Sequence, residues 1–137
     1  MIGAAIISIL LLFVASRFAW SRWIKTRYIS ASDKYDATIN SILEGIYPDT
    51  NSWGRNINDR LKQSIPAVEL AVNQFKRFIT RKEDIENALQ DYKDCCYETT
   101  YDEVTKYIMY NKDKGGFDPR EMFKARVKKL LKFAENP

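Results

Sequence analysis

The sequence predicts an all-α protein in which an N-terminal single transmembrane helix precedes a soluble bundle of four or five helices. Three observations support this prediction. The first sixteen residues contain no charged side chain. Beyond them, apolar residues recur at intervals of three and four, which is the period of an amphipathic helix. No segment alternates apolar and polar residues over the length of a strand, so we expect no sheet.

The composition excludes much of the chemistry that enzymes use. The 137 residues include no histidine, which excludes His-ligated metals, Ser–His–Asp triads and Cys–His pairs. None of the five glycines belongs to a phosphate-binding loop. The two cysteines, Cys95 and Cys96, are adjacent and form no disulfide framework, so we expect one half-buried and one surface thiol. We therefore predict no enzyme activity, no metal and no cofactor.

The N-terminal apolar segment, residues 1–16, is the strongest single feature. Sixteen helical residues extend about 24 Å, slightly less than the roughly 30 Å hydrocarbon core of a bilayer. Apolar character continues beyond the segment, so the helix is long enough to cross if the first arginine snorkels toward the headgroups. Basic and aromatic residues follow, as at a membrane–water interface. The predicted interface residues are Arg17, Trp20, Arg22, Trp23, Lys25, Arg27 and Tyr28.

The charges around this segment predict its orientation. Only the terminal amine precedes it, whereas four basic residues follow it before the first acidic residue, Asp33. The positive-inside rule then places the N-terminus outside and the rest of the chain in the cytoplasm. A change in composition near Ser30 marks the domain boundary. We assign residues 1–29 to the anchor and residues 30–137 to the bundle, with a short polar link or helix start at Ser30–Ser32.

Other interpretations of the N-terminal segment stay open. Val14-Ala15-Ser16 is an acceptable cleavage site, and cleavage there would give a secreted or periplasmic helical domain. A core or interfacial helix also fits the length. The small residues at positions 3–5 favour helix contacts in lipid, which suits a membrane-active effector such as a toxin, a holin-like protein or an exclusion protein.

Three amphipathic helices are predicted in the first half of the bundle. The first spans Asp33–Tyr47 and ends before a proline. The second begins near Ser52 and breaks or kinks near Ser64–Ile65, because an internal proline loses a hydrogen bond and clashes with the preceding turn. Pro66 then opens a third helix to Thr80. The apolar stripes consist of Ile39, Ile42, Leu43 and Ile46; then Trp53, Ile57 and Leu61; then Val68, Val72, Phe75 and Ile79.

A long acidic helix and a basic final helix complete the bundle. Thr80–Glu83 fits a capping box and opens a helix to about Asn111, with a bend at Thr99–Thr100. Asp118–Pro119 is a strong start signal for a last helix ending near Ala134, because aspartate caps and proline suits the first helical position. The long helix is rich in acids and the last is basic, so we expect them to pack together. The predicted stripe of the long helix is Ile85, Leu89, Tyr92, Cys96, Val104, Tyr107 and Ile108.

The loop between these two helices partly resembles a calcium loop. Asn111, Asp113 and Gly116 fit loop positions 1, 3 and 6 of an EF-hand. Gly115 and Met122 stand where position 5 and the bidentate glutamate belong. Neither residue has a side-chain oxygen. Because calcium binding depends most on the ligands at these two positions, we expect a turn without metal.

Two surfaces are candidates for partner contact, and a solvated bundle face is the plain alternative for both. Tyrosine is enriched at interfaces, and a basic amphipathic helix suits anionic lipid or an acidic partner. The predicted contact residues are Tyr97 and Tyr101 on the acidic helix, with Lys124, Lys128, Lys129 and Lys132 on the last. We expect membrane lipid and a protein partner or second copy, but no nucleic acid, because few aromatics interleave with the basic residues. The predicted function is protein–protein interaction at the cytoplasmic membrane face, as an adaptor, regulator or accessory subunit.

Overall fold

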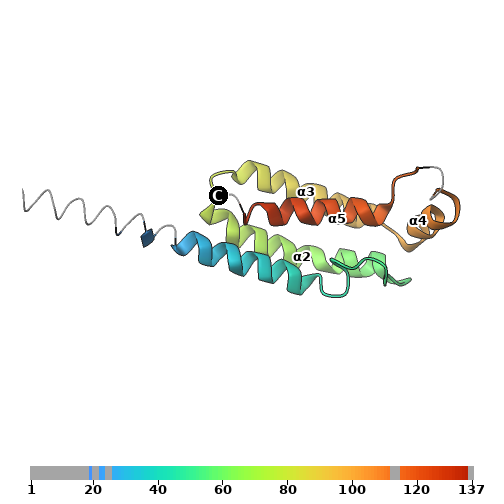
Figure 1. The fold of residues 1–137 in the computed structure, drawn as a ribbon, viewed down its shortest axis with the longest axis horizontal. Helices are drawn as coiled ribbons and strands as arrows, with labels where there is room; N and C mark the ends of the chain where they lie inside the picture. Colours follow the sequence, from blue (N-terminus) through green and yellow to red (C-terminus); the bar gives the residue numbers. More distant parts are fainter. Residues whose placement is uncertain (1–18, 20–21, 24–25, 112–114, 136–137) are drawn as a thin grey trace, which may run out of the picture.

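The fold is described by a computed structural model, which covers residues 19, 22–23, 26–111 and 115–135. Over these residues the protein is all-α, with five α-helices and no strand. Four of the helices run along one long axis, and the short helix α4 lies at one end (Figure 1). The all-α bundle predicted from the apolar periodicity is confirmed.

The first helix is described over residues 26–42, so helical residues precede the start that the sequence pattern indicates. Ser30–Ser32, expected as a short polar link or a helix start, lies inside this helix, and Ser32 is buried. Tyr35 explains the difference, because its buried ring extends the apolar stripe by one turn and stacks on Phe75 at 4.4 Å. The helix also ends early, in a turn where Gly45 has a φ of 80°, a conformation that glycine adopts at little cost.

Helix α2 (Ile57–Phe75) passes through Pro66 without ending, so the predicted break is wrong. Proline inside a helix costs about 3 kcal/mol. A single buried stripe nevertheless continues on both sides of it, and packing of that stripe outweighs the local cost. The 3₁₀ turn η1 (Lys76–Phe78) follows α2. The buried residues of α2 are Ile57, Leu61, Ser64, Ile65, Val68, Ala71, Val72 and Phe75.

The predicted long acidic helix is divided in two. Helix α3 (Lys82–Glu98) ends at extended residues, and α4 (Tyr101–Lys106) follows and leads into the π-helix η2 (Tyr107–Asn111). The backbone N–H of Glu103 donates to the Thr100 hydroxyl at 3.2 Å, which caps α4. No side chain caps the start of α3, so the capping box expected at Thr80–Glu83 is wrong. A second Thr-x-x-Glu sequence, Thr100–Glu103, forms a cap, but at the start of α4.

Asn58 of α2 stabilises the end of α3. Its side-chain amide donates to the carbonyl oxygens of Thr99 at 2.7 Å and Cys96 at 3.3 Å. Carbonyls at the end of a helix lack donors within that helix. We expect Asn58→Ala to lower the free energy of unfolding by about 1–2 kcal/mol, because it leaves partly buried carbonyls unsatisfied.

Urea unfolding followed by circular dichroism measures this loss. Asn73→Ala, at an exposed position on the same helix, is the matched control and should change stability by less than about 0.5 kcal/mol. Equal losses in the two variants would show that the Asn58 hydrogen bonds contribute nothing.

Helix α5 (Pro119–Lys132) begins where the sequence predicts. The Asp118 carboxylate accepts a hydrogen bond from the backbone N–H of Arg120 at 2.9 Å. Helix α5 packs against α3, which also packs against α2. Asp91 of α3 lies 3.5 Å from the Lys129 ammonium and 3.9 Å from the Arg126 guanidinium. The predicted pairing of the acidic and basic helices is therefore confirmed.

Aromatic rings from three segments meet in the centre of the core. The fully buried ring of Phe123 lies 5.4 Å from Trp53 and 5.9 Å from Tyr92. The Tyr92 hydroxyl lies 2.5 Å from the Ser64 hydroxyl. Since Ser64 donates its own proton to the Leu61 carbonyl, Tyr92 is the donor to Ser64. This buried network fixes the register of α3 against α2.

Both cysteines are buried and free, so the expected surface thiol is wrong. Helix α3 is covered by α2 on one side and by α5 on another. Adjacent positions on α3 therefore both face neighbouring helices, although side chains at successive positions point in different directions.

The predicted membrane anchor at residues 1–16 lies outside the described residues, as do Arg17, Trp20 and Lys25. Among the helices that the structure describes, none has the length and apolar character needed to cross a bilayer.

Candidate functional site

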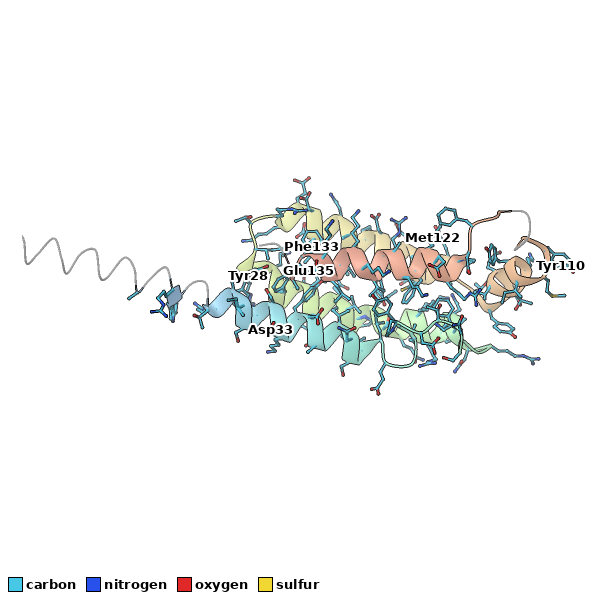
Figure 2. All side chains as sticks on the ribbon, viewed as in Figure 1. Tyr28, Asp33, Tyr110, Met122, Phe133 and Glu135 are labelled. Atoms are coloured by element: carbon cyan, nitrogen blue, oxygen red, sulfur yellow. The ribbon has the colours of Figure 1, made fainter. Side chains whose placement is uncertain are left out.

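The bundle has two chemically different ends (Figure 2). Tyr28 of the first helix and Phe133, which follows α5, lie at one end, whereas Tyr110 lies at the opposite extreme. The Tyr28 hydroxyl donates to the Phe133 carbonyl at 3.1 Å, which ties the start of the first helix to the end of α5. The chain that follows the predicted anchor and the π-helix η2 are thus at opposite ends of the molecule.

Large apolar side chains are exposed mainly at these two ends. The described residues include nine large exposed apolar side chains, and four of them flank the loop between η2 and α5. These four are Ile108, Met109, Tyr110 and Phe117, which we call the apolar tip. Met109 is 65% exposed and Phe117 is 78% exposed. Large apolar side chains that are exposed close together in the sequence are candidates for a protein or membrane contact surface.

The apolar tip was not predicted from the sequence. Ile108 was expected on the buried stripe, but it is 47% exposed. The apolar run Tyr107–Tyr110 directly precedes a loop, and four consecutive residues cannot all face one side of a helix. That unbroken run was the signal available in the sequence. Helix α4 contacts the core through Val104, and η2 follows it.

The predicted tyrosine patch is divided by the structure. Tyr97 on α3 is 60% exposed, and the Lys62 ammonium lies 6.0 Å from its ring centre. Tyr101 is on α4 and packs against the core. The two were expected on one helical face, but the interruption at Thr99–Thr100 places them on separate helices. The two tyrosines therefore do not share one helix, and contact of either with a partner stays a prediction.

The predicted lysines of α5 occupy different environments. Lys124 pairs with Glu121 at 3.3 Å, and Lys129 pairs with Asp91 on α3. Lys128 and Lys132 are exposed, and no carboxylate of the described chain forms an ion pair with them. Lys129 therefore links α5 to α3, Lys124 pairs within α5, and the other two lysines face solvent.

The predicted membrane-interface residues that the structure describes lie at the end of the bundle where the first helix begins. Arg22, Trp23 and Arg27 are exposed. Tyr28 is half-buried and belongs to the bundle, because its ring lies 6.2 Å from Phe75. The structure thus brings Trp23, Arg27 and Tyr28 together, at the end opposite the apolar tip.

The buried ionisable groups are held in their neutral forms. Burial raises the pKa of Cys96 to about 12 and also raises the pKa values of Cys95, Tyr35 and Tyr92. Protonated thiols and phenols of this kind are poor nucleophiles. No cluster of three potential metal ligands occurs in the part of the chain that is described. Residues 112–114 of the calcium-like loop lie outside that part.

A comparison with protein-family models, curated proteins and solved structures finds no match for this chain. The candidate site is therefore defined by the surface alone. The apolar tip is the feature of that surface that packing within the bundle does not explain.

Proposed function

We propose that this protein is a single-pass membrane protein that binds another protein through the apolar tip. Its helical domain lies at the cytoplasmic face, where it acts as an adaptor, regulator or accessory subunit. The observation that carries the proposal is the exposure of four large apolar side chains that flank the loop between η2 and α5, with Tyr110 at the end of the bundle opposite Tyr28. Such side chains supply most of the binding energy when a partner excludes water from them.

The N-terminal sequence supports the membrane part of the proposal. Residues 1–16 are uncharged, and four basic residues follow before Asp33. An anchor confines the domain to a thin layer beside the membrane and so raises its effective concentration toward membrane-bound partners. A modest interface is then sufficient for association.

The shape of the bundle supports the assignment of the partner surface to the apolar tip. The first helix, residues 26–42, extends about 25 Å. It begins at the end of the bundle opposite the apolar tip. In the proposed arrangement the helix therefore separates the apolar tip from the bilayer. Exposed tyrosine, methionine and phenylalanine are residue types that protein interfaces favour. The exposed Lys128, Lys132 and Tyr97 stay predicted as additional contacts.

Photo-crosslinking in native membranes tests this function. A photoreactive amino acid at position 109 of the full chain should give a discrete protein adduct, because Met109 is exposed at the apolar tip. The same group at Asn73, an exposed position on the side of the bundle, is the control and should give none. Adducts of equal yield from both positions, or none from position 109, would overturn the assignment.

The same site predicts a measurable loss of affinity. Met109→Asp should weaken binding to the crosslinked partner by about 30-fold or more, as expected when a charge enters an apolar contact. It should leave the midpoint of thermal unfolding unchanged, because the side chain is largely solvated in the free protein. Unaltered affinity would contradict a role for the apolar tip.

A further inference from the structure

An open groove lies between the first helix and the end of α2, at the end of the bundle where the described part of the first helix begins. Its volume is about 680 Å³, which is within the range of small-molecule sites. Aromatic rings form its inner surface. Tyr35 and Phe75 stack with their ring centres 4.4 Å apart, and Tyr28 lies 6.2 Å from Phe75. The bundle thus presents an apolar surface inside the groove.

The groove carries an excess of positive charge. Arg27, Lys34 and Arg77 line it, and no carboxylate of the described residues does. None of these three side chains takes part in an ion pair of the described chain. Other lysines of the bundle behave differently, since Lys93 pairs with Glu69 at 3.1 Å and Lys76 pairs with Glu86. The groove therefore attracts an anion that the protein itself does not supply.

Aromatic side chains extend the groove toward solvent. The Arg27 guanidinium lies 4.6 Å from the centre of the Trp23 ring and 5.6 Å from the centre of the Phe78 ring. Trp23 is 48% exposed. Tryptophan beside arginine is typical of the headgroup level of a membrane. Charge, aromatic rim and apolar interior together suit a ligand with an anionic head and an apolar body.

We propose that this groove binds the headgroup of an anionic phospholipid. The phosphate lies between the side chains of Arg27, Lys34 and Arg77, and the first acyl carbons contact the aromatic interior. Charge-assisted hydrogen bonds to phosphate are about twice as strong as neutral ones. The inference rests on the proposed anchorage, which brings the groove to the lipid surface. It adds a lipid preference that an apolar anchor alone does not supply.

Lipid retention by the full chain tests the proposal. The protein, including its N-terminal segment, is purified in neutral detergent with equal amounts of phosphatidylglycerol and phosphatidylcholine. Native mass spectrometry then counts the bound lipids. Wild type should retain phosphatidylglycerol about tenfold over phosphatidylcholine, as expected for at least one charge-assisted contact. Lys34→Glu combined with Arg77→Glu should abolish the preference.

Two control variants distinguish an effect of the groove residues from an effect of net charge or of misfolding. Lys62→Glu combined with Lys106→Glu makes the same change in charge at exposed positions outside the groove, and it should keep the preference. Lys34→Arg should keep it as well, because the cation remains. Loss in the Lys62/Lys106 variant, or an unchanged preference in the Lys34/Arg77 variant, would overturn the proposal.

Two further measurements distinguish a lipid from a soluble phosphate, and a failure of the anchor from a failure of the groove. Displacement of phosphatidylglycerol by excess inorganic phosphate would assign the groove to a soluble phosphate and overturn the lipid assignment. The Lys34/Arg77 variant should still resist carbonate extraction from membranes, since the anchor is intact. A wild-type chain that carbonate extracts would contradict the anchorage itself, whereas a retained chain without lipid preference would contradict the groove alone.

Discussion

Replacing Phe123 by alanine is expected to lower the free energy of unfolding by about 3–5 kcal/mol, as for other large buried aromatic residues. The ring is fully buried and lies 5.4 Å from Trp53 and 5.9 Å from Tyr92. These partners come from the turn after the first helix and from α3. The cavity would therefore open where three segments meet, and no single side chain is placed to fill it.

Urea unfolding monitored by circular dichroism measures this loss. Domains of this size are stable by about 5–15 kcal/mol, so the alanine variant is close to the limit of folding. Phe123→Leu keeps most of the volume and should retain the fold with a smaller loss. Lys128→Ala, at an exposed position on the same helix, should change stability by less than about 0.5 kcal/mol. Similar values for the Phe123 and Lys128 variants would contradict the described core.

The second large effect concerns the adjacent cysteines. In the folded protein, both thiols should react with iodoacetamide far more slowly than in the unfolded chain. Burial raises the pKa of Cys96 from 9.0 to about 12. At about pH 8 this lowers the fraction of reactive thiolate by about a thousandfold, before steric protection is counted. Burial also raises the pKa of Cys95.

Mass spectrometry of samples labelled with and without urea measures the two rates. Cys95→Ser leaves only the Cys96 thiol, and Cys96→Ser leaves only the Cys95 thiol. Each variant therefore measures the protection of the cysteine that remains. Equal labelling rates in the native and unfolded chains would show that α3 does not bury these residues.

The same burial predicts that stability falls at alkaline pH. Between about pH 9 and 12 the unfolded chain releases the Cys96 proton while the folded chain retains it. The contribution of this group is fully present below pH 9.0, its ordinary pKa. Above that it falls by up to about 1.4 kcal/mol per pH unit. Tyr35 and Tyr92, whose pKa values burial also raises, act in the same direction.

Local sequence signals were sufficient to predict where α5 begins. Asp118 and Pro119 begin α5 because their cap and fixed φ act within a few residues. Pro66 misled the prediction, since its local cost is outweighed by a buried stripe that spans all of α2. The cap at Thr100 formed where the one at Thr80 did not. Asn58 of α2 donates to the Thr99 carbonyl at the end of α3, a contact between helices that local sequence signals do not reveal.

The functional surface was harder to predict than the fold. Tyr28 follows a basic apolar segment and was assigned to the membrane interface, but its hydroxyl bonds the carbonyl of Phe133, which is 105 residues away. Sequence spacing contains no sign of such a pairing. Tyr107 and Ile108 were assigned to a buried stripe because helical periodicity does not show where the neighbouring helices end. The apolar tip extends beyond them.

The central claim is that an N-terminal anchor holds the bundle at the cytoplasmic face of a membrane. The most direct test is carbonate extraction of the full chain, combined with a topology reporter fused after Pro137. The account predicts a protein that stays in the membrane fraction at full length, with its C-terminus in the cytoplasm. A soluble protein, a product shortened to begin near Arg17, or a C-terminus outside the cytoplasm would contradict it.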